Sequence, residues 1–407
     1  MGKKKIFNDP IYGLISYPYE ILYDLIEHSY FQRLRRISQT GLAHYVYPGA
    51  HHTRFQHALG ALHLMTKAVQ SLRNKGVDIS EEEAEAVCIA ILLHDIGHGP
   101  YSHALERTII EVHHEELSLS YMNILNEEFE GKLGLAIEIF KGTYKKVFLH
   151  ELVSSQLDMD RMDYLSRDSY FTGVAEGVIG YDRLIKMLNV VDGHIVVEEK
   201  GIYSVEKFLM ARRLMYWQVY LHKTALGVEQ MLKAALLRAK NLILSNVKVS
   251  CSEPLFELIM YKKSLKSNDL ISSELMHLFS KIDDVDVLDM IKRNEHHEDI
   301  ILSYICQSLI KRQLFKVYLL PDKPSTESLK KVQAEVAKNL GINDQLVSNL
   351  IISGFENSQL YNAEIDEIRI LQKTGTVVPF SKFSDLKFDV KTTGKYFICS
   401  PIELGNI

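Results

Sequence analysis

The chain has 407 residues, which is long enough for two domains or for one large core with an appendage. Its net charge of −5 and its apolar fraction of 46% are ordinary for a globular protein and do not indicate nucleic-acid binding. Four widely spaced cysteines without a CxxC pair argue against a cysteine zinc site or a disulfide framework. We find no signal peptide and no apolar run of about 18 residues, so we expect a reduced, cytoplasmic protein that does not enter a membrane.

Amphipathic helices dominate the first 250 residues. Apolar residues recur at helical spacing over 18–39, and a second helix is predicted from Thr53 to Gly76. The next helix begins with a capping-box pattern, because Ser80 is followed three residues later by Glu83. Further amphipathic helices are predicted at about 113–128, 149–168 and 204–243.

A β-hairpin interrupts the helices at about 188–205, where Asp192-Gly193 separates two apolar runs. Helices continue to about 312, and the remaining residues combine one polar helix with short β-like runs. We therefore expect a mainly α fold with an all-helical core and a small hairpin over residues 1–250. Residues 251–407 are expected to form an α+β region that serves oligomerisation or regulation.

Residues 92–103 read LLHDIGHGPYSH and place three histidines and an aspartate directly after an apolar run. A single buried histidine is often an ordinary core residue, but an adjacent His94-Asp95 pair with two further histidines fits a metal-centred site better. Neighbouring residues on a helix point about 100° apart, so both can bind one ion only at a helix end. The remaining ligands must come from other helices, and His57 and Asp160 are the candidates.

A polar stripe follows Asp160. Asp160, Tyr164 and Asp168 step by four residues and share one helix face, and Arg161 flanks that face. A solvated surface is the plain alternative, but MDYLSRDSYF is rich in aromatic and apolar residues. A carboxylate, a cation and a phenol along one stripe suit a ligand with metal, phosphate and sugar parts.

A second stripe consists of Arg212, Tyr216 and Tyr220, again four residues apart. Alone it is more often an aromatic core stripe with a surface arginine. Together with the first stripe it can form the opposite wall of a nucleotide pocket, because aromatic rings stack on bases and arginine grips phosphates. His114 is a further candidate acid or base, although a lone histidine near a helix start is usually structural.

His57, the His94-Asp95 pair and Asp160 match the H…HD…D ligand set of the HD superfamily of metal-dependent phosphohydrolases. The strings YVYPGAHHTRFQHALG, LLHDIGHGPYSHALE, HHEELS and DMDRMDYLSRDSYFTGV resemble the deoxynucleoside triphosphate triphosphohydrolases, the dGTPase-like HD proteins. The resemblance covers roughly residues 5–225 and implies an HD-domain core with a divalent ion, which is Mn, Fe, Ni, Zn or Mg. It also implies hydrolysis of a dNTP at the α-phosphorus to a deoxynucleoside and inorganic triphosphate.

The resemblance further implies a role for each matching residue. The metal ligands would be His57, His94, Asp95 and Asp160. The catalytic residues would be Asp95, His98 and His114 near the α-phosphate and His103 as proton donor to the leaving sugar oxygen. The triphosphate would be held by Arg54, Arg161 and Arg212. The sugar and base would be contacted by Gln39, Tyr164, Asp168, Tyr216 and Tyr220. Thr40 and Tyr216 depart from the mammalian enzyme of this group, which leaves base preference open.

KIFNDPIYG and EHSYFQRLR resemble the allosteric nucleotide site of the same family, where a guanine is read by an acid, a glutamine and an arginine. The matching residues are Lys5, Glu27, Gln32 and Arg35, with Glu27 in place of an aspartate. A surface helix with ordinary charges is the alternative. If the site exists, dGTP or GTP binds across subunits and promotes a homo-oligomer, either a dimer or a tetramer.

Two other functions remain open at this point. The chain could be an HD phosphohydrolase for another phosphate ester, such as a nucleoside monophosphate or a cyclic dinucleotide, although three arginines favour a triphosphate. It could also be a nucleotide sensor without turnover, although the complete set of histidines argues against a dead site. Neither a membrane nor a nucleic acid is indicated as a partner.

Overall fold

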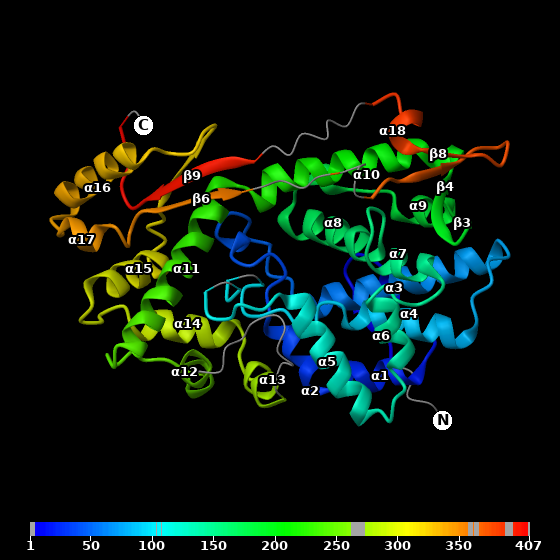
Figure 1. The fold of residues 1–407 in the computed structure, drawn as a ribbon, viewed down its shortest axis with the longest axis horizontal. Helices are drawn as coiled ribbons and strands as arrows, with labels where there is room; N and C mark the ends of the chain where they lie inside the picture. The colour runs from blue at the N-terminus through cyan, green and yellow to red at the C-terminus, as the bar shows by residue number, and fades with distance from the viewer. Residues whose placement is uncertain are drawn as a thin grey trace.

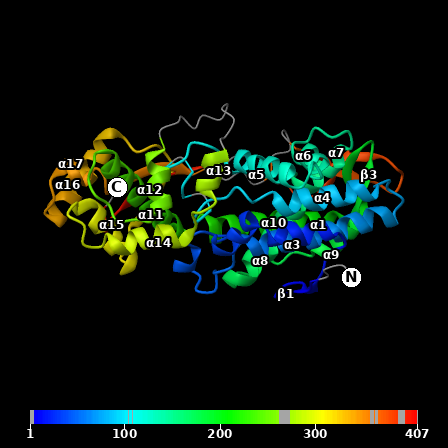
Figure 2. The ribbon, with the colours of Figure 1, turned by 90° about the horizontal axis from the view of Figure 1, so that it is seen from below.

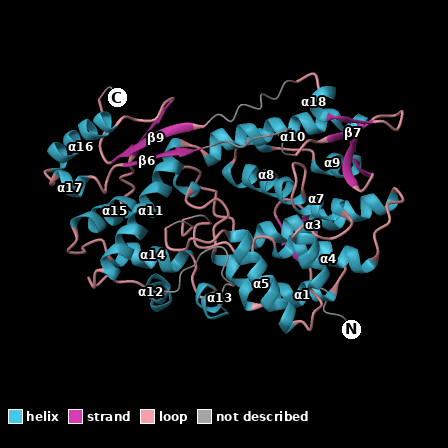
Figure 3. Cartoon of the chain, in the orientation of Figure 1, coloured by secondary structure: helices cyan, strands magenta, loops and turns pink. Residues whose placement is uncertain are grey.

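The computed structural model describes residues 5–102, 104–106, 108–261, 273–356, 361, 366–386 and 394–405. The predicted proton donor His103 lies outside the described residues. Helices dominate the structure, with small sheets at its edges (Figure 3). The molecule is elongated: the helices between residues 300 and 347 lie at one end, and the N-terminus lies toward the other (Figures 1 and 2).

The central helices confirm the predicted mainly α core. They are α1 (Glu20–Glu27), α2 (Ser29–Gln32), α3 (Arg54–Asn74), α4 (Glu81–Leu93), α5 (His114–Glu128), α6 (Gly134–Phe140), α7 (Val147–Val153), α8 (Met159–Thr172), α9 (Tyr181–Met187), α10 (Ile202–Met215) and α11 (Lys223–Leu244). Helix α3 packs against both α4 and α8, and these three helices carry the HD motif. The capping box before α4 is present, since the Ser80 amide donates to Glu83 and the Glu83 amide donates back to Ser80.

Three predicted helices are interrupted. The helix expected over 18–39 ends at His28, whose extended backbone (ψ 141°) separates α1 from α2 and whose ring caps α2. The helix expected over 149–168 is two helices, because Asp158 caps the start of α8. The helix expected over 204–243 changes to a π-helical turn at Tyr216–Tyr220 before α11 begins. Such π turns are frequent at functional sites.

The predicted hairpin is present as β3 (Leu188–Val191) and β4 (His194–Glu198). Asp192 and Gly193 have φ of 52° and 80°, as a two-residue turn between twisted strands requires. Strands β7 (Arg369–Leu371) and β8 (Val377–Pro379) extend this hairpin into a sheet with the order β3-β4-β7-β8. The chain therefore returns from its C-terminal region to the helical core.

The C-terminal region is α+β, as expected. Its helices are α12 (Glu253–Met260), α13 (Ser273–Phe279), α14 (Asp284–Arg293), α15 (Ile300–Ile310), α16 (Thr326–Leu340), α17 (Asp344–Val347) and α18 (Phe380–Phe383). Strands β5 (Lys316–Leu320), β9 (Lys395–Ser400) and β6 (Ile352–Glu356) form an antiparallel sheet in that order, and β5 packs against α11. Strands β1 (Phe7–Asp9) and β2 (Gly13–Ile15) form a separate N-terminal hairpin. Among the described helices, each is too short or too polar to cross a bilayer.

Candidate metal centre and nucleotide cavity

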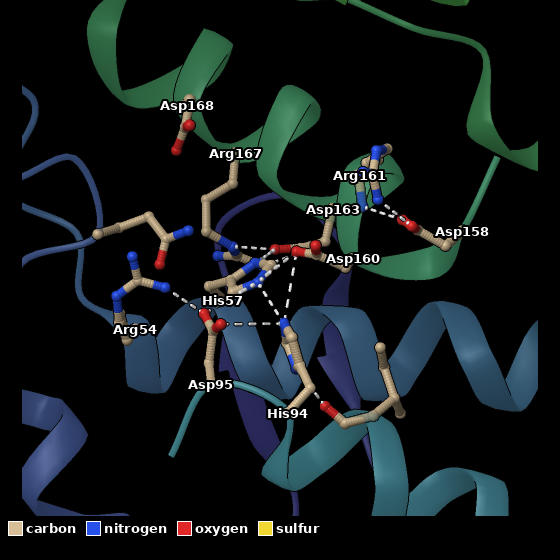
Figure 4. Close-up of polar contacts among 12 residues, drawn as sticks. Arg54, His57, His94, Asp95, Asp158, Asp160, Arg161, Asp163, Arg167 and Asp168 are labelled. Atoms are coloured by element: carbon tan, nitrogen blue, oxygen red, sulfur yellow. Dashed lines mark hydrogen bonds and ion pairs between the residues drawn. The ribbon is translucent and has the colours of Figure 1, made fainter. Parts of the chain in front are cut away.

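Four side chains from three helices converge on one point (Figure 4). His57 comes from α3, His94 and Asp95 directly follow the end of α4, and Asp160 comes from the first turn of α8. Nε2 of His57 lies 3.0 Å from Oδ1 of Asp160 and 3.3 Å from Nε2 of His94. Asp95 lies 3.4 Å from His94 and 3.6 Å from His57. The end of α4 allows both members of the HD pair to face the same point.

The two imidazoles are held so that both Nε2 atoms face this point. Nδ1 of His57 lies 2.8 Å from Oδ2 of Asp163, and Nδ1 of His94 lies 2.6 Å from the carbonyl oxygen of Ile91. A partner on the second ring nitrogen determines the tautomer and leaves Nε2 free to bind a metal. Two imidazoles and two carboxylates are a donor set for a divalent metal ion, and the cofactor of this protein is such an ion.

The charges at this point also fit a cation. Burial lowers the pKa of His57, but hydrogen bonds to Asp160 and Asp163 outweigh burial and raise it to about 10. Burial alone would raise the pKa of the Asp160 carboxyl. His57 and His94 outweigh burial and hold this pKa far below its usual value. A divalent ion that binds here must displace protons from the histidines, so metal affinity falls as the pH falls.

A buried network behind the candidate metal ligands was not predicted from the sequence. Asp163 is fully buried and accepts hydrogen bonds from Tyr12 (2.7 Å) and from Arg167 (2.9 and 3.0 Å), in addition to its contact with His57. Arg167 also pairs with Asp9 of β1 at 2.9 Å. Charged residues inside an apolar stretch of α8 were the available signal, since Asp and Arg are rarely buried without partners.

The loop after the HD pair is held by a second buried arginine. Arg33 is 1% exposed and donates to the carbonyl oxygens of Ile96 (3.0 Å), His98 (2.7 Å) and Ile282 (3.2 Å). A guanidinium that satisfies three carbonyls fixes the path of the loop. Arg33 therefore positions Asp95 and His98 through the backbone.

A cavity of about 700 Å³ opens beside the metal centre. Of the predicted residues, those that line it are Gln39, Arg54, Asp95, His98, His114, Asp160, Tyr164, Asp168, Tyr216 and Tyr220. Cavities of this volume accept ligands the size of a nucleotide. The side-chain oxygens of Gln39 and Thr40 are buried without hydrogen-bond partners among the described residues, so both are available to a ligand.

Some lining residues lie far from the motifs in sequence and were missed. Glu229 and Lys233 come from α11 and pair at 2.5 Å, and Phe355 and Glu356 come from the end of β6. Gly394 lies against the ring of Phe355, where a Cβ would approach within 2.0 Å. The C-terminal region therefore forms part of the cavity wall.

His98, His114 and Glu106 form a cluster on the cavity wall. The rings of His98 and His114 stack with centroids 3.9 Å apart, and Nδ1 of His114 lies 2.9 Å from Glu106. Their ligand atoms lie within 4.8 Å of one another. Two imidazoles and a carboxylate this close to the cavity can transfer protons to or from a bound ligand. Burial and Arg54 lower the pKa of His98, while Asp95 raises it less.

The three predicted phosphate arginines differ in their surroundings. Arg54 lines the cavity, pairs with Asp95 and donates to Oγ of Ser102 at 2.9 Å. Arg161 pairs with Asp158, as Figure 4 shows, and is not among the residues that line the cavity. Arg212 also lies off the cavity wall and donates to Oε1 of Gln156 at 2.8 Å. The structure therefore places one of the three arginines on the cavity wall.

The four residues of the predicted allosteric site form two local pairs. Nζ of Lys5 lies 2.7 Å from Glu27, and Nε of Arg35 donates to Oε1 of Gln32 at 2.8 Å. The guanidinium of Arg35 also lies 3.6 Å from the centre of the Phe55 ring. These contacts are compatible with an ordinary charged surface, so the allosteric site stays a prediction.

Comparisons with known proteins agree with this geometry. Residues 54–168 match the family model of the HD domain, and residues 179–249 match that of the HD associated region. The uncharacterized protein YwfO of Bacillus subtilis is 33% identical over 323 residues, which cover 78% of this chain and 72% of YwfO. A phosphohydrolase crystal structure from Bacteroides thetaiotaomicron has a TM-score of 0.93 at 45% identity and covers 98% of this chain and 100% of its own.

A third relative carries an activity in its name. The Dictyostelium discoideum homologue of deoxynucleoside triphosphate triphosphohydrolase SAMHD1 is 32% identical over 255 residues, which cover 58% of this chain. The alignment spans about half of that relative, 49% of its length. Two family matches in tandem, long relatives above 30% identity and a converged H…HD…D centre lead to one conclusion: the chain belongs to the HD-domain phosphohydrolases.

Proposed function

We propose that this protein is a deoxynucleoside triphosphate triphosphohydrolase that cleaves a dNTP at the α-phosphorus into a deoxynucleoside and inorganic triphosphate. One observation carries the proposal: the H…HD…D centre lies at the wall of a 700 Å³ cavity that is also lined by Tyr164, Asp168 and Tyr220. A metal at one end and a carboxylate with two phenols at another match a nucleotide better than a small phosphate ester. The SAMHD1 relatives support the same substrate class.

The residues on the cavity wall supply the remaining chemistry. When bound, the metal ion acts as a Lewis acid that neutralises phosphate charge and lowers the pKa of a water. Arg54 presents a guanidinium to the phosphates from a site where Asp95 and Ser102 hold it rigidly. His98 and His114 act as general acid or base near the α-phosphate. On the resemblance alone, His103 gives the proton to the leaving sugar oxygen.

Tyr164 and Tyr220 restrict which sugar the cavity can accept. Their rings meet edge to face with centroids 6.2 Å apart, and the hydroxyl of Tyr220 donates to Asp168 at 2.5 Å. A tyrosine ring beside the 2′ carbon of the sugar leaves little room for the additional 2′ hydroxyl of a ribonucleotide. We therefore propose that deoxynucleotides are preferred over ribonucleotides.

Product identity tests the proposal. The purified protein is incubated with each dNTP, with and without Mn and dGTP, and the products are separated by chromatography. Equimolar deoxynucleoside and intact triphosphate are expected. Release of pyrophosphate or orthophosphate from a dNTP, or turnover of a nucleoside monophosphate or cyclic dinucleotide instead, would establish the alternative phosphohydrolase. Bound metal without hydrolysis of any of these substrates would establish a nucleotide sensor.

We further propose that a guanine nucleotide activates the enzyme by promoting a homo-oligomer. The support is the resemblance of Lys5, Glu27, Gln32 and Arg35 to the allosteric site of the family. Both ion-pairing side chains of the Lys5–Glu27 pair are about half exposed (45% and 55%), so a nucleotide can reach them.

A further inference from the structure

One buried histidine neither lines the cavity nor belongs to the metal centre. It lies behind Asp168 and Tyr220, the cavity residues that are proposed to contact the sugar. His52 lies in the loop before α3 and is 1% exposed. Its Nε2 lies 2.6 Å from Oδ1 of Asp168, and the other oxygen of that carboxylate accepts the Tyr220 hydroxyl at 2.5 Å. The three side chains form one hydrogen-bonded chain, in which His52 is the member that does not line the cavity.

We propose that His52 is a positioning residue for nucleotide binding: it orients the Asp168 carboxylate, and through it the Tyr220 hydroxyl, toward the sugar in the cavity. The inference rests on the proposed function, because it takes the cavity to hold a nucleoside. Asp168 is 2% exposed, and a buried carboxylate needs hydrogen-bond donors on both oxygens to stay in one rotamer. Each oxygen can accept a second hydrogen bond, so Asp168 keeps capacity for a sugar hydroxyl.

The ring of His52 is fixed independently of Asp168. It stacks on Phe171 with centroids 4.6 Å apart and an interplanar angle of 12°. The loop lies so close to α8 that a Cβ on Gly49 would come within 2.5 Å of the Phe171 carbonyl oxygen. His52 is therefore a rigid support rather than a side chain that follows Asp168.

Hydrogen-bond accounting determines which tautomer acts. Nδ1 of His52 is buried and has no partner among the described residues. A ring that donates from Nε2 leaves Nδ1 as an acceptor without a partner, whereas the other tautomer would bury an Nδ1 donor without an acceptor. Unpaired buried donors are the rarer of the two. The arrangement therefore favours the tautomer of His52 that donates from Nε2 to Asp168.

The backbone of His52 also supports a second residue of the cavity wall, Gln39. Its carbonyl oxygen accepts the amide of Gln39 at 3.0 Å, and Gln39 lines the cavity with an unpartnered side-chain oxygen. One residue thus supports two groups that are predicted to surround the deoxyribose. Among the described residues, the hydrogen bonds and the ring contact of His52 do not involve the candidate metal ligands. Loss of its side chain should therefore weaken binding of the nucleoside part of the substrate alone.

The experiment compares three variants of the full, metal-loaded protein. His52→Leu removes the donor, His52→Gln places an amide nitrogen near the position of Nε2, and His52→Asn places it near Nδ1 instead. KM and kcat are measured with the preferred dNTP, and the inhibition constant is measured with inorganic triphosphate. We expect KM to rise about tenfold in His52→Leu and His52→Asn, as for a buried carboxylate that loses one partner. His52→Gln should restore KM to within about threefold of the wild type, and the triphosphate constant should not change in any variant.

A role in packing alone would give a different result. Equal weakening of dNTP and triphosphate in His52→Leu, or failure of His52→Gln to recover, would overturn the inference. If His52→Leu does not fold, the comparison of His52→Gln with His52→Asn still tests the inference. A positioning role requires that KM differ between these two variants. A Tyr220→Phe background adds a check: the effects of His52→Asn and Tyr220→Phe should not be additive, since both act through Asp168.

Failure of the proposed function is separable from failure of this inference. If the wild type hydrolyses no dNTP, the same variants are compared by calorimetric binding of a dNTP and of inorganic triphosphate. Selective loss of nucleotide binding in His52→Asn supports the positioning role without turnover. Unchanged nucleotide binding in His52→Asn and His52→Leu would overturn it.

Discussion

The buried carboxylate of Asp163 lies 2.8 Å from Nδ1 of His57 and thereby directs the other ring nitrogen of His57 toward the metal centre. Asp163→Asn keeps the shape of this contact but removes the charge that orients the imidazole. We expect metal affinity to fall by about 10- to 100-fold, as for other outer-shell partners of metal-binding histidines. Titration of the apoprotein with Mn measures it. Equal affinity in the variant and the wild type would show that Asp163 only stabilises the fold.

The HD pair itself should be indispensable. His94→Ala combined with Asp95→Ala removes two of the four groups that converge at the candidate metal centre, and Asp95 also holds Arg54. We expect loss of both bound metal, measured by mass spectrometry of the purified protein, and triphosphate release. Full turnover in the double variant would refute the assignment of the metal centre. Lys67→Ala, on the exposed face of the same helix as His57, is the matched control and should retain both.

Gly60 leaves the space that the Asp163–Arg167 pair occupies. A Cβ there would lie 2.0 Å from Oδ1 of Asp163 and 2.2 Å from Nη2 of Arg167. Gly60→Ala should therefore destabilise the protein by about 1–3 kcal/mol and weaken metal binding. Urea unfolding measures the first effect and Mn titration the second. Gly134→Ala is the control, because nothing lies within 4 Å of its added Cβ, and it should leave both properties within error.

The capping box of α4 predicts a pH effect on stability. Burial raises the pKa of Glu83, but hydrogen bonds from Lys146 (2.7 Å) and Tyr144 (2.7 Å) outweigh burial and lower it. A group whose folded pKa lies below its unfolded value stabilises the fold above that unfolded value of about 4.5 and loses this contribution as the pH falls through the folded pKa.

Glu83→Gln should therefore lower the free energy of unfolding at pH 7, and the difference from the wild type should shrink below about pH 4.5. Urea titrations across pH 3–7 measure this, with exposed Glu127→Gln as the control. A difference that stays constant over this range would show that the charge of Glu83 contributes nothing. The expected loss at pH 7 is about 1 kcal/mol, as for other caps.

The predicted allosteric site makes a prediction about assembly. If dGTP binds at Lys5, Glu27, Gln32 and Arg35 across subunits, it should raise the sedimentation coefficient and the rate of dNTP hydrolysis together. dCTP should not, because it lacks the guanine edge that the acid reads. Glu27→Gln should abolish both responses while leaving unstimulated turnover unchanged. No change of mass and no change of rate with dGTP would count against the site.

Local patterns in the sequence were sufficient for most of the secondary structure and for naming the four residues that the fold brings together at the candidate metal centre. Capping at Ser80, the Asp192-Gly193 turn and the apolar periodicity of α3 depend on a few neighbouring residues, so short stretches predict them. The breaks at His28 and at Tyr216–Tyr220 were not predictable in this way. Helical periodicity continues through both, and tertiary packing decides where the helix changes.

Contacts between distant segments were decided by the tertiary structure alone. The sequence indicated that Asp168 and Tyr220 belong to one pocket, but not that His52 holds the carboxylate between them. It gave no sign that Phe355, more than 130 residues after Tyr220, reaches the same cavity wall. Periodicity and motif spacing report which face of an element is buried, whereas the partner across that face depends on how the helices pack.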